Sequence, residues 1–367
     1  MSNPSRRTLI TAPALLTAPA LIAAAPALRS GPLTASRRAG RFELVVRPTR
    51  VFKTSDRSHE QTESWIFSLL VQTATEEKLR PGSMHIDMLR RGRVVRSVSC
   101  PTEGFLPLTF QTAARPRLPD GRAPERPFFW PWAIRLRGCE PITLGVDRLR
   151  VEVTATEEHG WRSTAALEIP IETYTQKTAL IFPFRGKGII LQAGATNGGH
   201  RNRSGEFALD AMGLDEAWSV QAPGHGKKNA DYPGWGRPII APAAGQVVRA
   251  RDDRPDQPVG DASDPAFYAP EYPNGGDPGN HLVIDQGEGE FSMIAHFQGG
   301  SMLVRPGDRV SQGQALGKLG HSGDTNAPHV HYQLQAGPDW EYADALPCRF
   351  TNVSEQVLDR GTYFEAV

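Results

Sequence analysis

Histidines are concentrated in the C-terminal part of this sequence. Seven of the ten follow residue 199, and two of them form the segment His329-Val330-His331. In an extended chain, residues two apart point to the same side, with Cα atoms roughly 6 to 7 Å apart. Both imidazoles therefore face one side of a strand, where one can bind a metal ion while the other reaches what the metal holds.

Other polar residues stand at the ends of apolar, strand-like runs in the same half of the chain. His296 follows Met-Ile-Ala, and Asp210 follows Phe-Ala-Leu, with His200 ten residues before it. Two histidines and one carboxylate satisfy a catalytic zinc ion, which takes three protein ligands and keeps one position open. The three cysteines include no closely spaced pair, so a metal site here must use histidine and carboxylate.

A series of short motifs then follows in a fixed order. They are Gly236-Arg-Pro-Ile-Ile-Ala-Pro-Ala-Ala-Gly245, Gly279-Asn-His-Leu-Val-Ile-Asp285, Ala295-His296, Val304-Arg-Pro-Gly-Asp-Arg-Val-Ser-Gln-Gly-Gln-Ala-Leu-Gly317, Gly320-His-Ser-Gly323 and Pro328-His-Val-His331. Over about residues 180–340 this conjunction resembles the lysostaphin and LytM type of zinc metallopeptidase, a family of peptidoglycan endopeptidases.

The resemblance implies roles for individual residues. Asp210 and His331 would bind zinc together with a histidine upstream, while His296 and His329 would be the catalytic residues beside the reacting water. Either imidazole can accept the proton of that water, and the other can stabilise the oxyanion.

The first metal ligand departs from the family pattern. The family places a histidine four residues before the aspartate, where this chain has Glu206. If residues 206–210 form one straight strand, Glu206 and Asp210 lie roughly 13 Å apart, which is too far for one ion. His200 precedes a polar segment ending in Gly205 that can turn the chain back. We therefore predict His200, Asp210 and His331 as the zinc ligands, with Glu206 as the competing candidate.

The expected function is zinc-dependent hydrolysis of peptide bonds in peptidoglycan stems or crosslinks. An alternative is an inactive relative that binds cell wall or activates a partner hydrolase. A lipoyl- or biotinyl-type carrier is a third interpretation, because residues 304–314 resemble the turns of such domains, but the chain lacks a Met-Lys-Met-like tripeptide for modification. The 41 basic and 40 acidic residues nearly cancel, so no overall field favours nucleic acid or an anionic membrane surface.

The first residues have the features of an export signal. Arg6 and Arg7 precede an apolar run that ends in Ala25-Pro26-Ala27, so residues 1–27 are predicted to be a twin-arginine-like signal peptide. A membrane anchor is the alternative, but prolines interrupt a run that is already shorter than the roughly 20 residues that span a bilayer. The expected location is periplasmic or extracellular.

Alternating short apolar and polar segments predict an all-β protein. Residues 40–173 are expected to form an accessory β-sandwich, and residues 174–367 an antiparallel β-sheet peptidase domain of the lysostaphin-like type. The predicted strands are residues 42–46, 64–72, 84–89, 94–98, 132–136, 149–153 and 165–171, then 178–182, 188–192, 206–210, 239–241, 246–250 and 281–285. Residues 113–127, 221–236 and 251–279 are expected to be long surface loops.

Overall fold

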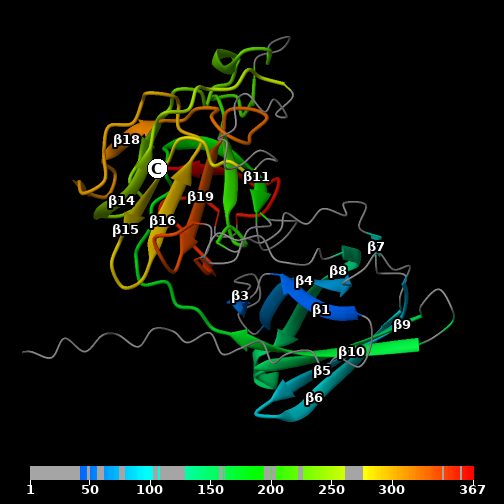
Figure 1. Ribbon diagram of the computed structural model, residues 1–367. Coiled ribbons are helices and arrows are strands. Elements are labelled where there is room, and N and C mark those ends of the chain that lie inside the picture. Colours follow the sequence, from blue (N-terminus) through cyan, green and yellow to red (C-terminus); the bar gives the residue numbers. More distant parts are fainter. Residues whose placement is uncertain are drawn as a thin grey trace, which may run out of the picture. The chain divides into compact units, whose positions relative to one another are not determined.

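A computed structural model (Figure 1) describes the chain in segments. They are residues 42–47, 50–55, 62–73, 79–101, 106–107, 129–156, 160, 162–193, 200, 204–221, 226–260, 276–340, 343–355 and 358–367. The predicted signal peptide, the loop 113–127 and parts of both predicted insertions lie outside these residues. Within them, regular structure is almost entirely strand, which confirms the all-β prediction, and no helix is long and apolar enough to cross a membrane.

The N-terminal strands form two mainly antiparallel sheets. The strands are β1 (Phe42–Arg47), β2 (Val51–Phe52), β3 (Thr54–Ser55), β4 (Thr62–Thr73), β5 (Arg80–Arg90), β6 (Arg93–Pro101), β7 (Leu106–Pro107), β8 (Phe129–Pro141), β9 (Arg148–Thr156) and β10 (Arg162–Glu172). One sheet has the order β1-β4-β8-β7, with β3 beside β4, and the other has the order β2-β10-β9-β5-β6. Strands β2 and β10 are parallel.

Alternation of apolar and polar residues explains why these two sheets pack face to face. Along β9, Leu149, Val151 and Val153 are buried while the residues between them face outward. They join Trp65 and Leu69 of β4 in one hydrophobic core. This arrangement is the predicted sandwich.

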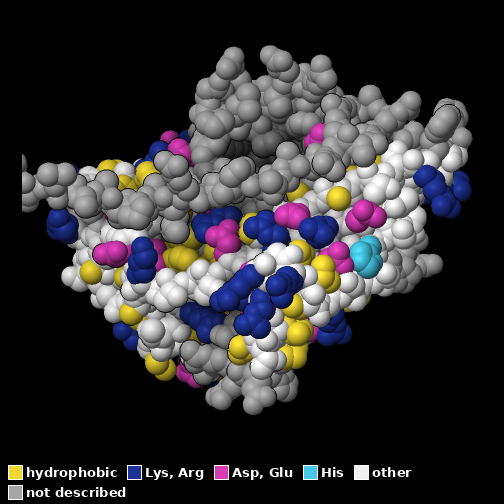
Figure 2. Space-filling model, turned by 90° about the horizontal axis from the view of Figure 1, so that it is seen from below, with side chains coloured by type: hydrophobic (Ala, Val, Ile, Leu, Met, Phe, Trp, Pro, Cys, Tyr) yellow, Lys and Arg dark blue, Asp and Glu magenta, His cyan; other side chains and the backbone are white. Residues whose placement is uncertain are grey.

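The outward faces carry charges of both signs. Figure 2, which views the molecule from below, shows basic side chains gathered with acidic ones between them. On the outer face of β9 and β10, Arg148 and Arg150 both pair with Glu168, at 3.3 and 3.1 Å. Exposed pairs of this kind contribute little stability, about 0 to 1 kcal/mol each.

The C-terminal strands build one large sheet and one small one. The strands are β11 (Gly186–Ala193), β12 (Leu209–Gly213), β13 (Pro238–Ile240), β14 (Gly245–Arg251), β15 (His281–Asp285), β16 (Phe291–Ala295), β17 (Arg309–Val310), β18 (Ala315–Lys318), β19 (Val330–Gln335), β20 (Ala345–Leu346) and β21 (Tyr363–Ala366). The large sheet has the order β17-β14-β15-β16-β19-β12-β11-β21, with β20 beside β19, and β13 pairs with β18. All of its pairings are antiparallel.

The large sheet buries one of its faces in a second hydrophobic core. Leu282 and Ile284 of β15, Ile294 of β16, and Tyr332 and Leu334 of β19 all belong to this core. Because successive side chains point to opposite faces, the alternate residues His281, Ala295 and His331 lie on the other face. This second face of the sheet carries the candidate site.

Two predicted strands in this half are wrong. Residues 178–182 contain only an isolated bridge between Leu180 and Phe350. Residues 204–207 form a turn, in which Ala208 N donates to Gly205 O at 2.9 Å, and β12 begins only at Leu209. A turn at Gly205 lets the chain reverse before Asp210, where the apolar pattern alone suggested a strand. The predicted domain bounds at residues 173 and 174 stay a prediction.

Candidate metal centre and active site

Three neighbouring strands bring the predicted site residues together. Strands β16, β19 and β12 are adjacent, and the register places His331 opposite both Asp210 and Ala295. His329 immediately precedes β19, and His296 immediately follows β16. Residues from three distant parts of the sequence therefore meet on one sheet face.

His200, Asp210 and His331 form a compact group of metal-ligand type. One ligand atom from each residue can be chosen so that all three lie within 4.8 Å of one another. Nε2 of His200 lies 3.0 Å from Oδ2 of Asp210, and Nδ1 of His331 lies 3.0 Å from Oδ1. The Nε2 atom of His200 is buried and has no partner in hydrogen-bond geometry among the described residues. An orphaned nitrogen aimed at a carboxylate fits a shared cation.

The surroundings of His331 also fit a cation. Its Nδ1 faces Asp210, and its Nε2 lies 2.9 Å from Oε1 of Gln333, so acceptors lie on both sides of the ring. A neutral imidazole carries one proton and can satisfy only one of them. A zinc ion on the Nδ1 side would satisfy the other, and His, Asp and His are a donor set that zinc accepts.

His296 and His329 lie beside this group, and each has one nitrogen held by a carbonyl. Nδ1 of His296 lies 2.7 Å from Ser322 O, and Nδ1 of His329 lies 2.9 Å from Ala327 O. Carbonyl oxygens only accept. The Thr325 hydroxyl also lies 2.9 Å from Nδ1 of His329, but it donates to Ala327 O. In the neutral rings each Nδ1 therefore carries the proton and each Nε2 keeps its lone pair. The two ring centroids are 4.7 Å apart, and Nε2 of His329 is 3.7 Å from Oδ1 of Asp210.

The backbone at His296 adopts a conformation that is uncommon for residues other than glycine. Its φ is 64°, in the left-handed region, which costs a non-glycine residue about 1 to 2 kcal/mol. Hydrogen bonds on both sides hold this conformation, because Phe297 N donates to Asn280 O and Gly320 N donates to His296 O, both at 3.0 Å. Strain retained in this way is frequent at active sites.

Burial and neighbouring charges set the ionisation of the group. Burial lowers the pKa of His296 well below its ordinary value, and the nearby His329 and His331 lower it further. Burial opposes the charge of Asp210, but His200, His331 and His329 together hold the pKa of this carboxyl well below its usual range. Burial likewise works against a charge on His200, yet Asp210 leaves its pKa raised. The site therefore holds a carboxylate beside a neutral His296 that can accept a proton.

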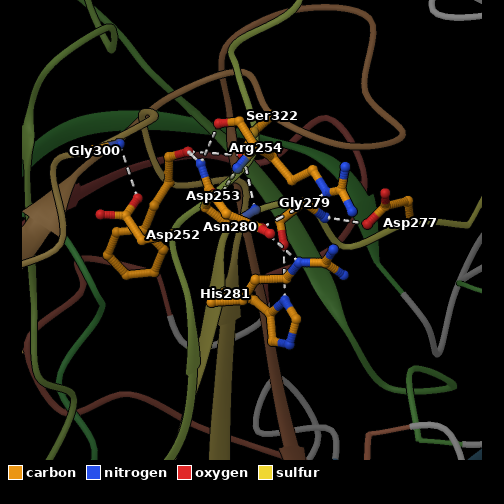
Figure 3. A network of polar contacts seen from close by, with 11 residues as sticks. Asp252, Asp253, Arg254, Asp277, Gly279, Asn280, His281, Gly300 and Ser322 are labelled. Carbon is orange, nitrogen blue, oxygen red and sulfur yellow. Dashed lines mark hydrogen bonds and ion pairs between the residues drawn. The ribbon is translucent and has the colours of Figure 1, made fainter. Parts of the chain in front are cut away.

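A network of polar contacts supports the carbonyl that holds His296 (Figure 3). Asn280 N donates to Oγ of Ser322 at 3.0 Å, and this hydroxyl donates to Phe297 O at 2.7 Å. The amide of Asn280 in turn bonds Arg254 O, and Arg254 N donates back to Oδ1 of Asn280, both at 2.9 Å. Figure 3 shows Arg254, Asn280 and Ser322 close together, whereas the ring of His281 points away from them.

Two other histidines of this half, His281 and His321, lie outside the metal group. Nδ1 of His281 bonds Gly279 O at 2.8 Å. His321 is buried, with Nδ1 2.7 Å from Oδ1 of Asn229, and burial lowers its pKa to about 4. Glu206, the competing ligand, is buried in the turn before β12 and is not part of the three-residue group.

Three residues that support the site were not predicted from the sequence: Ser322, Gln333 and Ser204. A signal for Gln333 was present, because His331 and Gln333 are two residues apart on one strand and must share a face. Ser322 acts through its backbone carbonyl, which no residue type reveals.

The comparisons with known proteins identify the family of this region. Residues 228–342 match the model of Peptidase family M23. The matched segment includes His296, His329 and His331 but begins after His200 and Asp210. Residues 228–342 are thus similar to Peptidase family M23, a metallopeptidase family.

Individual relatives match over shorter or more divergent stretches. Two Vibrio cholerae proteins, the peptidoglycan DD-endopeptidases ShyA and ShyC, are each 38% identical over 56 residues, which is 15% of this chain and 13% and 12% of theirs. The catalytic domain of the M23 protein EnpA from Enterococcus faecalis is 20% identical, covering 46% of this chain and 93% of that domain with a TM-score of 0.27. The catalytic domain of lysostaphin from Staphylococcus simulans is 19% identical, covering 44% and 88% with a TM-score of 0.25. The chain therefore spans only about an eighth of the curated relatives that it matches.

Proposed function

We propose that this protein is an exported, zinc-dependent endopeptidase that hydrolyses peptide bonds in peptidoglycan stems or crosslinks. The observation that carries the proposal is the compact group of His200, Asp210 and His331 beside two imidazoles whose Nδ1 atoms are held by backbone carbonyls. The names of ShyA and ShyC support peptidoglycan as the substrate class. The signal peptide predicted from the sequence supports a location in the periplasm or outside the cell.

In this proposal His200, Asp210 and His331 would hold the zinc ion. When bound, zinc polarises a carbonyl and lowers the pKa of water towards 7. His296 and His329 do the proton work, since both present an unprotonated Nε2. One of them accepts the proton of the attacking water and later delivers it to the leaving amine. The other takes a proton from solvent on its Nε2 and keeps it, and in this form it stabilises the oxyanion.

The third ligand of the proposed site is His200. Its orphaned Nε2 beside Asp210 supports it, and a neutral imidazole leaves the ion more positive than a second carboxylate such as Glu206 would. Zinc content and hydrolysis of His200→Ala and Glu206→Gln distinguish the two residues. An active, metal-loaded His200→Ala protein would overturn the assignment.

The experiment for the whole proposal is digestion of purified sacculi by the zinc-loaded protein. Mass spectrometry of the released muropeptides should show cleaved peptide bonds and intact glycan, and Asp210→Ala should release nothing. The unusual spacing of His200 and Asp210 favours a second candidate, an inactive relative that binds wall or activates a partner hydrolase. Sacculi that bind the protein without any release of muropeptides would support that candidate and contradict ours.

A further inference from the structure

A chain of buried amides continues from His331 along the same face of β19. His331, Gln333 and Gln335 alternate on this strand, with 7%, 1% and 0% of their surface exposed. Oε1 of Gln333 faces Nε2 of His331 at 2.9 Å. Nε2 of Gln333 donates both to Oγ of Ser204, at 2.9 Å, and to Oε1 of Gln335. Burying so many polar groups is tolerable only because each is hydrogen-bonded.

The ends of this chain fix the direction of every hydrogen bond in it. The amide nitrogen of Gln335 lies 2.6 Å from Gly337 O, and the hydroxyl of Ser204 donates to Trp340 O. Both ends are backbone carbonyls, which can only accept. Gln335 must therefore turn its oxygen towards Gln333, and Gln333 must in turn offer its NH2 group to Gln335 and Ser204. Its own oxygen is left for His331.

This direction determines which nitrogen of His331 carries the proton. The Gln333 oxygen can only accept, so Nε2 of His331 carries a proton. In the neutral ring this leaves the Nδ1 lone pair, on the side of Asp210, for a zinc ion. Partners of this kind fix the tautomer and orientation of metal-binding histidines and raise their basicity. The amide of Gln333 also reaches Ser204, in the segment between His200 and Asp210, and so ties β19 to the part of the chain that carries the other two ligands.

We infer that Gln333 is a positioning residue that sets the Nδ1 donor of His331 for zinc and, through Ser204, holds the turn before Asp210 against β19. This inference rests on the proposed zinc site. Gln333 is not part of the three-residue metal group, and it acts through His331 and Ser204. Its removal should change metal affinity before it changes anything else.

The test measures the zinc affinity of the full-length protein by competition with a chromophoric chelator. Gln333→Met keeps the length of the side chain but removes both the acceptor and the donors, and its zinc affinity should fall 10- to 100-fold, as is typical when such a partner is lost. Gln333→Glu keeps an acceptor for His331 and should retain more affinity than Gln333→Met. Gln286→Met is the matched control, since among the described residues its side-chain amide bonds only the Ser292 hydroxyl. The zinc affinity of this variant should equal that of the wild type.

A second readout does not depend on how well the variants fold. Imidazole ¹⁵N spectra of the zinc-loaded wild type should show His331 bound through Nδ1 with a slowly exchanging proton on Nε2. Zinc bound through Nε2, or equal affinity in Gln333→Met and the wild type, would overturn the inference while leaving the proposed function standing. A wild type that binds no zinc would instead overturn the proposed function, and the inference with it.

Discussion

Gly279→Ala should damage the site through the carbonyl that holds His296. Gly279 has a φ of 60°, and an added Cβ would lie 2.3 Å from Ser322 O and 2.4 Å from its carbonyl carbon. Ordinary contact needs roughly 3.5 Å, so the Ser322 carbonyl has to move by about 1 Å. The same carbonyl accepts the Nδ1 proton of His296. A displacement of this size in catalytic positioning costs on the order of 100-fold in turnover.

The matched control separates this displacement from backbone strain. Gly276, three residues earlier, has a φ of 81° and no atom within 4 Å of an added Cβ. An alanine in the left-handed region costs about 1 to 2 kcal/mol at either position. For a domain of this size that lowers Tm by roughly 2 to 8 °C.

The assay compares muropeptide release by both variants with the wild type, at a temperature at which circular dichroism shows all three folded. Gly276→Ala should keep wild-type turnover, and Gly279→Ala should lose about 100-fold. Equal turnover of the two folded variants would refute the positioning role assigned to the Ser322 carbonyl.

Three other outcomes are expected. Elemental analysis of the purified protein should find zinc near one equivalent, and only magnesium or calcium, or no metal, would contradict the site. His296→Ala and His329→Ala should keep zinc but lose on the order of 100-fold or more in turnover. Asp210→Ala and His331→Ala should lose zinc as well. If His329→Ala lost zinc while His331→Ala kept it, the roles of His329 and His331 would be reversed. The pKa of His296 is lowered, so its neutral, proton-accepting form persists below the ordinary histidine pKa of about 6.5. At constant zinc occupancy, kcat/KM should therefore decline only as the pH falls below about 6.5. A decline in kcat/KM centred above about pH 6.5 would count against His296 as the base.

The sequence predicted those parts of the site that depend on strand geometry. His329 and His331 share a face because strand residues alternate, and apolar runs correctly placed β15 and β16 ahead of the site. The segment before Asp210 was harder, because its apolar residues suggested a strand where Gly205 makes a turn. The hydrogen bond from Ala208 N to Gly205 O stabilises a turn in this segment instead of a strand.

Supporting residues were beyond what a sequence pattern can predict. The Ser322 carbonyl and the left-handed backbone of His296 depend on how β16 meets the segment 320–323, a contact between distant parts of the chain. Gln333 could be placed on the face of His331, but its orientation follows only from the carbonyls of Gly337 and Trp340. The directions of these hydrogen bonds are determined only once the chain is folded.

Anomalous diffraction at the zinc edge from crystals of the zinc-loaded protein tests the central claim most directly. We expect one strong peak about 2 Å from Nε2 of His200, Nδ1 of His331 and an oxygen of Asp210, with His296 and His329 unligated beside it. A peak coordinated by Glu206 in place of His200, or no peak on this face of the sheet, would contradict the account.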